Sequence, residues 1–257
     1  MSRADPAATR PIVVDVGQRA VTVSFNRPEK RNALNIKVSQ AISRVLDEHR
    51  DTPLPVVFRS ATPGMFVAGT DVAQLKQRTV ADSLARLNGV LFQQIHDHPW
   101  PTVAVVDGAA LGGGCELSLA CDLRISSEQA QWGLPEVRLG IIPSAGGLTR
   151  LSRLVGAGTA SDLVLTGRRI SGREAGAVGL ASRVVASEEL DDALASVLAD
   201  LAAAAPLAQR LAKEAMRVDG DRHRLVDAAA QALCIDSDEA QQRLAALLDR
   251  GSRKPRG

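Results

Sequence analysis

Residues Thr102 to Asp122 read TVAVVDGAALGGGCELSLACD, and the rest of the chain is organised around this stretch. Val103 to Val106 is a short β-branched run, which predicts a buried strand that ends at a turn. Three consecutive glycines follow at 112–114, and the apolar run after them has helical rather than strand character. The sequence therefore predicts a strand, a glycine-rich corner and a helix in succession.

This corner could place a hydrogen-bond donor beside a carboxylate. The first turn of a helix has unpaired N–H groups and a partial positive charge, and glycine lets a ligand approach the backbone closely. If the helix begins near Gly113, Glu116 lies on the same face with its side chain leaning back toward the helix N-terminus. The alternative is a tight strand–helix corner in which Glu116 only stabilises the first turn.

The composition favours a large folded core and gives no sign of nucleic-acid binding. The chain has 257 residues, 45% hydrophobic, which is ample for one large domain or a domain with an appendage. A net charge of +2 and an aromatic content of 2% predict neither a strong positive field nor a base-stacking surface. The N-terminus lacks the apolar segment of a signal peptide, and no run approaches transmembrane length. We therefore expect a soluble, cytoplasmic protein that binds no membrane.

The cysteines and histidines predict neither a disulfide framework nor a metal site. Cys115, Cys121 and Cys234 are few, odd in number and lack metal-ligand spacing. Reduced thiols in a cytoplasmic protein are the expected state. Cys115 has no histidine near it in a recognisable pattern, so we do not expect it to be a nucleophile.

Before the central stretch, the pattern alternates between strands and helices. Ile12–Val16 and Ala20–Phe25 predict a β-hairpin, and an apolar stripe predicts a helix over Asn35–Asp51. A strand is expected at Val56–Phe58. It leads into a second strand–loop–helix corner over Pro63–Asp71, where backbone amides should again be free.

After the central stretch, Trp132 to Pro143 is apolar yet rich in glycine and proline, which predicts a buried irregular loop that frames a site. Glu136 lies in this loop. Helices are expected from 144–147 to Leu154, over Gly158–Val164 and over Ser171–Ala177, where Ser171 and Glu174 fit a capping box. Helices alone follow, with breaks predicted at Pro206, Gly220 and Asp236-Ser237.

This order of elements predicts an α/β core with an α-helical appendage. We assign residues 11–190 to the core, 191–250 to the helical region, and 1–10 and 251–257 to flexible tails. In the polar loop before the first helix, Arg27, Lys30 and Arg31 form either a phosphate-facing lip or a solvated surface.

Several stretches, taken together, resemble the enoyl-CoA hydratase/isomerase (crotonase) family. Each motif is weak alone, but their order and spacing are specific, and the resemblance covers about residues 12–250. The motifs are Asn26-Arg27-Pro28 with Asn32-Ala33-Leu34, Phe66 to Asp71, Gly108 to Glu116, and Pro135-Glu136 with Leu139 to Pro143 and Gly146-Gly147.

The resemblance implies a crotonase-like core of repeated β-β-α units in a spiral, and a C-terminal helical region that forms a homotrimer or a hexamer of two trimers. It implies a coenzyme A thioester as substrate, with no separate cofactor. The backbone amides of Ala68 and Gly113 would hold the thioester oxygen. Arg27, Lys30 and Arg31 would contact coenzyme A phosphates. Substrate binding is assigned to Ala33, Leu34, Ala68, Gly69, Thr70, Asp71, Gly113 and Ser144.

Having both Glu116 and Glu136 favours hydration of an α,β-unsaturated acyl-CoA, with Glu116 as the base on water and Glu136 as the proton donor to the α-carbon. Two close carboxylates resist double ionisation, so one should stay protonated near neutral pH, and the sequence does not decide which of the two carries the proton. The alternatives are double-bond isomerisation or another acyl-CoA reaction of this family, and an acyl-CoA-binding protein without turnover. Ser144 and Leu134, which stand where hydratases often have Gly and Gln, bear on the choice of substrate.

Overall fold

The computed structural model describes residues 10–77, 79–217, 229 and 231–243. The chain forms two compact units, Met1–Leu198 and Ala199–Gly257. The described strands are β1 (Ile12–Val16), β2 (Val21–Phe25), β3 (Val56–Ser60), β4 (Thr102–Val106), β5 (Ala109–Leu111), β6 (Leu123–Ser127), β7 (Gln131–Gly133), β8 (Ile170–Ser171) and β9 (Arg183–Val185).

The described α-helices are α1 (Ile36–Glu48), α2 (Val72–Gln77), α3 (Val80–Ala85), α4 (Leu87–His96), α5 (Gly113–Ala120), α6 (Gly147–Thr166), α7 (Gly172–Ala177), α8 (Leu190–Ala203) and α9 (Pro206–Ala215). Short 3₁₀ turns are η2 (Pro28–Lys30), η3 (Pro135–Leu139) and η4 (Ser187–Glu189). Within the described ranges, no helix combines the length and the apolar character that crossing a membrane requires.

Two sheets organise the first unit. The larger has the strand order β1-β2-β3-β4-β6-β9, and the smaller has the order β5-β7-β8. The predicted hairpin is confirmed, because β1 and β2 pair antiparallel, whereas the remaining pairs of the larger sheet are parallel. All five residues of β4 are buried, as expected for a strand inside a parallel sheet covered on both faces.

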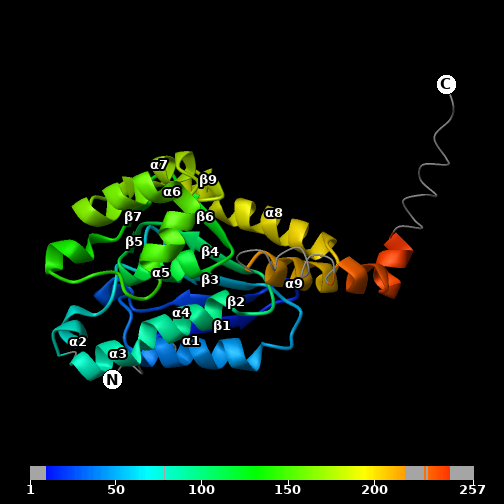
Figure 1. The fold of residues 1–257 in the computed structure, drawn as a ribbon, viewed down its shortest axis with the longest axis horizontal. Coiled ribbons are helices and arrows are strands. Elements are labelled where there is room, and N and C mark those ends of the chain that lie inside the picture. Colours follow the sequence, from blue (N-terminus) through cyan, green and yellow to red (C-terminus); the bar gives the residue numbers. More distant parts are fainter. Residues whose placement is uncertain (1–9, 78, 218–228, 230, 244–257) are drawn as a thin grey trace, which may run out of the picture. The chain divides into compact units, whose positions relative to one another are not determined.

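Successive segments repeat one pattern: a strand of the larger sheet, a strand of the smaller sheet, then a helix. The run β4–β5–α5 has this form, and the run from β6 through β7 to α6 repeats it (Figure 1). Val67, which follows β3, adds a single parallel bridge to Ala110 of β5. The structure therefore confirms the repeated β-β-α core.

Helices α1 and α4 pack against each other beside the larger sheet (Figure 1). The predicted apolar stripe of α1 is buried at Val38, Ile42, Val45 and Leu46. Asn35 caps this helix, since its side chain accepts a hydrogen bond from the Val38 N–H. Helix α1 thus begins where the sequence predicts.

Helix α5 begins at Gly113, as predicted, and all eight of its residues are buried. It also passes very close to the backbone of Val67. A Cβ added to Gly114 would lie 1.9 Å from the Val67 carbonyl oxygen, so only glycine fits. This close approach holds the glycine corner against the segment that leads to residues 68–71.

Two local predictions need correction. Trp132 lies in strand β7, not in an irregular loop, and three residues are too few to show a strand periodicity. The two helices expected around 147–164 form one element, α6, kinked at Gly156 (φ 78°, ψ 159°).

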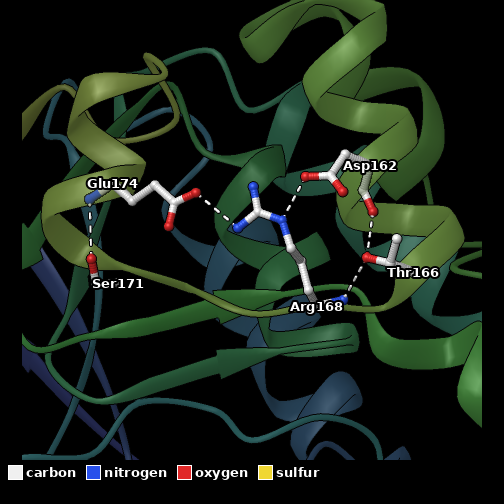
Figure 2. A network of polar contacts seen from close by, with 5 residues as sticks. All are labelled: Asp162, Thr166, Arg168, Ser171 and Glu174. Carbon is white, nitrogen blue, oxygen red and sulfur yellow. Dashed lines mark hydrogen bonds and ion pairs between the residues drawn. The ribbon is translucent and has the colours of Figure 1, made fainter.

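The capping box at Ser171 forms only in part. The Ser171 hydroxyl accepts from the Glu174 N–H at 3.2 Å. The Glu174 carboxylate instead pairs with Arg168 at 2.8 Å, and Arg168 also pairs with Asp162 (Figure 2). A charged partner thus replaces the backbone N–H that a capping box would offer.

Two of the three predicted breaks between the C-terminal helices are confirmed. A break at Pro206 separates α8 from α9, and a second falls at Asp236-Ser237, as predicted. The predicted break at Gly220 and the tails, apart from Arg10, lie outside the described residues. The compact units divide at Leu198, within α8, and the buried residues of this helix, Leu190, Leu194 and Val197, all precede that point.

Replacing Gly114 with Ala should lower the free energy of unfolding by about 1–3 kcal/mol, because the new Cβ forces α5 away from Val67. The matched control is Gly158→Ala in α6, where an added Cβ meets nothing within 4 Å. The control should leave stability unchanged or raise it by up to ~1 kcal/mol, because Ala favours a helix more than Gly does. Urea unfolding followed by circular dichroism measures both. Equal stability of the two variants would refute the packing constraint.

Candidate active site

The glycine corner opens onto a cavity of about 190 Å³. Both Glu116 and Glu136 line it, so the structure brings the two predicted carboxylates into one small volume. Its walls come from the second corner, from the start of α5, and from η3 with the loop behind it. Lining residues include Ala68, Gly69, Thr70, Gly112, Gly113, Glu116, Glu136, Leu139, Ile141, Ile142 and Ser144.

Glu116 lies in the first turn of α5 and is only 5% exposed. Its Oε1 accepts hydrogen bonds from the backbone N–H groups of Ala145 (2.7 Å) and Gly147 (3.0 Å). Two such donors on one oxygen stabilise a carboxylate in its charged form. The turn before α6 therefore supplies the hydrogen bonds that a buried carboxylate requires.

Arg150 holds that turn from the other side. Its Nη1 donates to the Ala145 carbonyl at 3.1 Å, and its Nη2 donates to Gln93 Oε1 of α4 at 3.0 Å. Burial lowers the pKa of the guanidinium, and the Glu116 carboxylate opposes this by raising it. Sequence reasoning left Arg150 as a surface or structurally paired residue, because an arginine in a helical first turn is usually solvated.

Glu136 occupies a different environment, in η3. Its pKa is raised to about 7, mainly because burial disfavours the charged form and partly through the charge of Glu116, while its own backbone N–H works against the rise. Its Oε2 is buried and has no hydrogen-bond partner within the described part of the chain. The two carboxyl groups therefore differ: Glu116 accepts two amide hydrogen bonds, whereas Glu136 has a raised pKa and can carry a proton near neutral pH.

The prediction that the Ala68 N–H is an oxyanion donor is wrong. Its N–H is already donated to the Arg31 carbonyl at 3.1 Å, so it is not free to bind a ligand. Gly69 has a φ of 120°, which breaks the extended run and turns the next peptide. The N–H of Thr70 then has no acceptor among the described residues. It lies 3.7 Å from the point that a Cβ on Gly113 would occupy.

The Gly113 N–H likewise has no acceptor in the described ranges. Thr70 and Gly113 therefore each present an open amide at the corner. Sequence reasoning assigned Thr70 to substrate binding but not to this role, because spacing alone does not reveal which way a single peptide faces. The role of Gly113 as a donor stays a prediction, as do the catalytic roles of the two glutamates.

The remaining predicted binding residues divide into two groups. Gly69 and Ser144 line the cavity. Leu34 is buried, and both its N–H and its carbonyl bond to the 69–71 segment, so it supports the corner from behind. Neither Ala33 nor Asp71 lines the cavity.

The basic loop residues also lie away from the cavity. Arg27 turns inward, donating to the Ala33 carbonyl at 2.6 Å and lying 3.7 Å from the Asp71 carboxylate. Lys30 and Arg31 are exposed. Phosphate binding by these three residues stays a prediction.

Cys115 is unsuited to nucleophilic chemistry. Burial raises the pKa of its thiol well above the ordinary range, and the charges of Glu136 and Glu116 raise it further. A thiol that stays protonated is a poor nucleophile. Among the residues that the structure describes, no cluster of three or more His, Cys, Asp or Glu side chains could hold a metal ion.

Comparison with known proteins agrees with this geometry. Residues 16–244 match the enoyl-CoA hydratase/isomerase family. The chain is 32% identical over 247 residues to the short-chain-enoyl-CoA hydratase of Clostridium acetobutylicum, covering 93% of this chain and 95% of that protein. It is 41% identical over 222 residues to the human mitochondrial enoyl-CoA hydratase domain-containing protein 2, and the match covers 83% of this chain and 74% of that protein.

A crystal structure of an enoyl-CoA hydratase from Bacillus anthracis superposes on the chain with a TM-score of 0.88 at 33% identity, covering 93% of this chain and 96% of that one. The chain belongs to the enoyl-CoA hydratase/isomerase family.

Replacing Glu136 with Gln should stabilise the protein by about 2 kcal/mol at pH 8, after allowance for the partial exposure of the carboxyl. The folded pKa, about 7, lies above the unfolded value, so the folded state binds the proton more tightly. The stability of the native chain therefore falls as pH rises from ~4.5 to ~7 and is level above that range. Urea titrations across this pH range measure the effect.

The matched control for this experiment is Glu48→Gln on the exposed end of α1. It should leave the pH dependence of the unfolding free energy unchanged. If Glu136→Gln retains the wild-type pH dependence, the buried carboxyl is not the source of this instability.

Proposed function

We propose that this protein catalyses the hydration of an α,β-unsaturated acyl-CoA thioester to the 3-hydroxyacyl-CoA. One observation supports this most: an amide-bound Glu116 and a Glu136 of raised pKa share a cavity with the open amides of Thr70 and Gly113. The hydratase names of the similar proteins from Clostridium acetobutylicum and Bacillus anthracis support the same reaction.

The amides act on the thioester carbonyl. When water adds to the β-carbon, negative charge builds on the thioester oxygen, which becomes enolate-like. The N–H groups of Thr70 and Gly113 would stabilise this charge, and losing one such donor typically costs about 3 kcal/mol of barrier. Neither donor is a titratable side chain, so this stabilisation is independent of pH.

The two glutamates would divide the proton transfers. The Glu116 carboxylate takes a proton from water as the oxygen bonds to the β-carbon, and protonated Glu136 gives its proton to the α-carbon of the enolate. Water has then been added across the double bond, and a proton returned from Glu116 to Glu136 restores the site. A positioned acid or base usually contributes ~10²–10⁴-fold in rate.

The walls of the cavity suit an acyl chain. Leu139, Ile141 and Ile142 follow Glu136 along the chain and line the cavity, although all three are exposed. Leu87 of α4 lines it as well. An apolar tail entering past the carboxylates would cover these side chains, at a gain of about 25 cal/mol for each Å² removed from water.

The proposed function also concerns the cofactor requirement, the assembly and the location of the enzyme. Coenzyme A enters as part of the substrate, and the addition of water by two carboxylates and two amides uses no separate cofactor. We further propose a homotrimer or hexamer assembled through residues 191–250, located in the cytoplasm and without nucleic-acid partners. Three free cysteines are compatible with a reducing compartment.

Double-bond isomerisation is the second candidate. It needs only one group to move a proton between two carbons. Glu136, with its raised pKa and its unpartnered buried oxygen, is suited to that task. The anionic Glu116 would then have no part in the reaction, which separates the two candidates experimentally.

The purified protein should convert crotonyl-CoA to 3-hydroxybutyryl-CoA, measured as loss of the absorbance of the conjugated thioester. Glu116→Gln and Glu136→Gln should each lower kcat at least ~100-fold, because each removes one proton transfer. The control Glu48→Gln should retain wild-type turnover.

Three results would contradict the proposed hydration. Absence of turnover with short, medium and branched 2-enoyl-CoA esters would exclude it. Normal activity of either glutamine variant would remove the assigned role of that glutamate. Conversion of 3-enoyl-CoA to 2-enoyl-CoA that survives Glu116→Gln would favour the isomerase.

The pH dependence of kcat/KM should show a loss of activity above about pH 7, since Glu136 must be protonated in the free enzyme to act as the acid. A rate profile measured with crotonyl-CoA tests this. A profile that stays level from neutral to alkaline pH would show that Glu136 does not supply the proton.

A further inference from the structure

Thr70 brings a side-chain hydroxyl to the same corner as its open amide. Its Oγ1 lies 2.9 Å from the point that a Cβ on Gly113 would occupy, and its backbone nitrogen lies 3.7 Å from that point. Since Gly113 has no side chain, the Thr70 hydroxyl can lie this close to its backbone, and both residues line the cavity. An oxygen held by the two amides would therefore come within reach of the Thr70 hydroxyl as well.

Asn88 sets the direction in which this hydroxyl can donate. The Nδ2 of Asn88, in the first turn of α4, donates to Thr70 Oγ1 at 3.3 Å. The Asn88 Oδ1 in turn lies 3.5 Å from the Ser39 hydroxyl of α1, at the long end of hydrogen bonding. A hydroxyl oxygen that accepts from an amide keeps its own proton for another acceptor. Bonds in series also polarise each other in the same sense.

We propose that the Thr70 hydroxyl is a third hydrogen-bond donor to the thioester oxygen, and that Asn88 is the residue that positions it. This inference depends on the proposed function, because it concerns the same oxygen. It goes further in assigning a side chain, which can be deleted by mutation, to a role otherwise filled by backbone amides.

A purely structural role for Thr70 makes different predictions. The Asn88–Thr70 hydrogen bond joins α4 to the second corner, so its loss could simply loosen the cavity. Loosening would weaken the binding of every acyl-CoA alike. A missing donor would matter only for ligands that carry negative charge on the thioester oxygen.

The decisive variants are Thr70→Val, which keeps the shape but removes the hydroxyl, and Thr70→Ser, which keeps the hydroxyl. With crotonyl-CoA, Thr70→Val should lower kcat by about tenfold or more while KM changes little, and Thr70→Ser should stay close to wild type. Thr22→Val, the same change on β2 outside the cavity, is the matched control.

Binding provides a readout that a structural role would not reproduce. Acetoacetyl-CoA can bind as its enolate, whereas butyryl-CoA remains neutral. Thr70→Val should weaken the binding of acetoacetyl-CoA by about tenfold and leave the binding of butyryl-CoA nearly unchanged. Equal weakening of both ligands, or an unchanged kcat, would overturn the proposal.

Asn88 is tested by reversing its polarity. In Asn88→Asp a carboxylate replaces the amide donor, so the Thr70 hydroxyl should turn toward it and leave the thioester oxygen. We expect a loss of kcat similar to that of Thr70→Val, and no further loss in the double variant, since both changes remove one donor. Additive losses would overturn the positioning role of Asn88.

The same experiments separate this inference from the proposed function. Hydration by the wild type with no effect of Thr70→Val would refute the third donor and leave the hydratase intact. Absence of hydration, combined with Thr70-dependent preference for acetoacetyl-CoA, would refute the hydratase and retain the donor. A wild type that binds neither ester would overturn both.

Discussion

The Glu116 carboxylate accepts hydrogen bonds from the amides of Ala145 and Gly147, and this contact joins α5 to the turn that precedes α6. A charge that is only 5% exposed would be very costly without such partners. Arg150 completes the arrangement by tying the same turn to α4. Helices α4, α5 and α6 are thereby linked through the turn that binds Glu116 Oε1.

The same cavity gives its two carboxylates opposite characters. Glu116 has two amide donors and a nearby guanidinium, whereas Glu136 is desolvated and faces the charge of its partner. Asymmetry of this kind is how one site provides a base and an acid at the same pH. It also has a cost in stability, since a carboxyl that resists ionisation weakens the folded state as pH rises. Functional sites commonly carry such a cost.

Much of the fold could be predicted because its signals are periodic or chemically specific. The stripe of α1 and the helix start at Gly113 are local properties of the sequence. What could not be predicted depended on single peptides or on tertiary partners. Ala68 and Thr70 are two residues apart, and only the backbone turn at Gly69 decides which N–H is free. The contact of Arg150 with Gln93 could not be predicted, because the two residues are 57 positions apart in the sequence.

The run Gly112-Gly113-Gly114 combines three separate constraints rather than one flexible corner. A side chain on Gly112 would come within 2.9 Å of Glu136 Oε1, one on Gly113 would meet the Thr70 hydroxyl, and one on Gly114 would strike the Val67 carbonyl. The first glycine therefore makes room for the Glu136 carboxyl, the second for the Thr70 hydroxyl, and the third for the close packing of α5 against Val67. Because Val67 and Thr70 lie in one segment and Glu136 lies in another, the corner fixes both segments relative to α5.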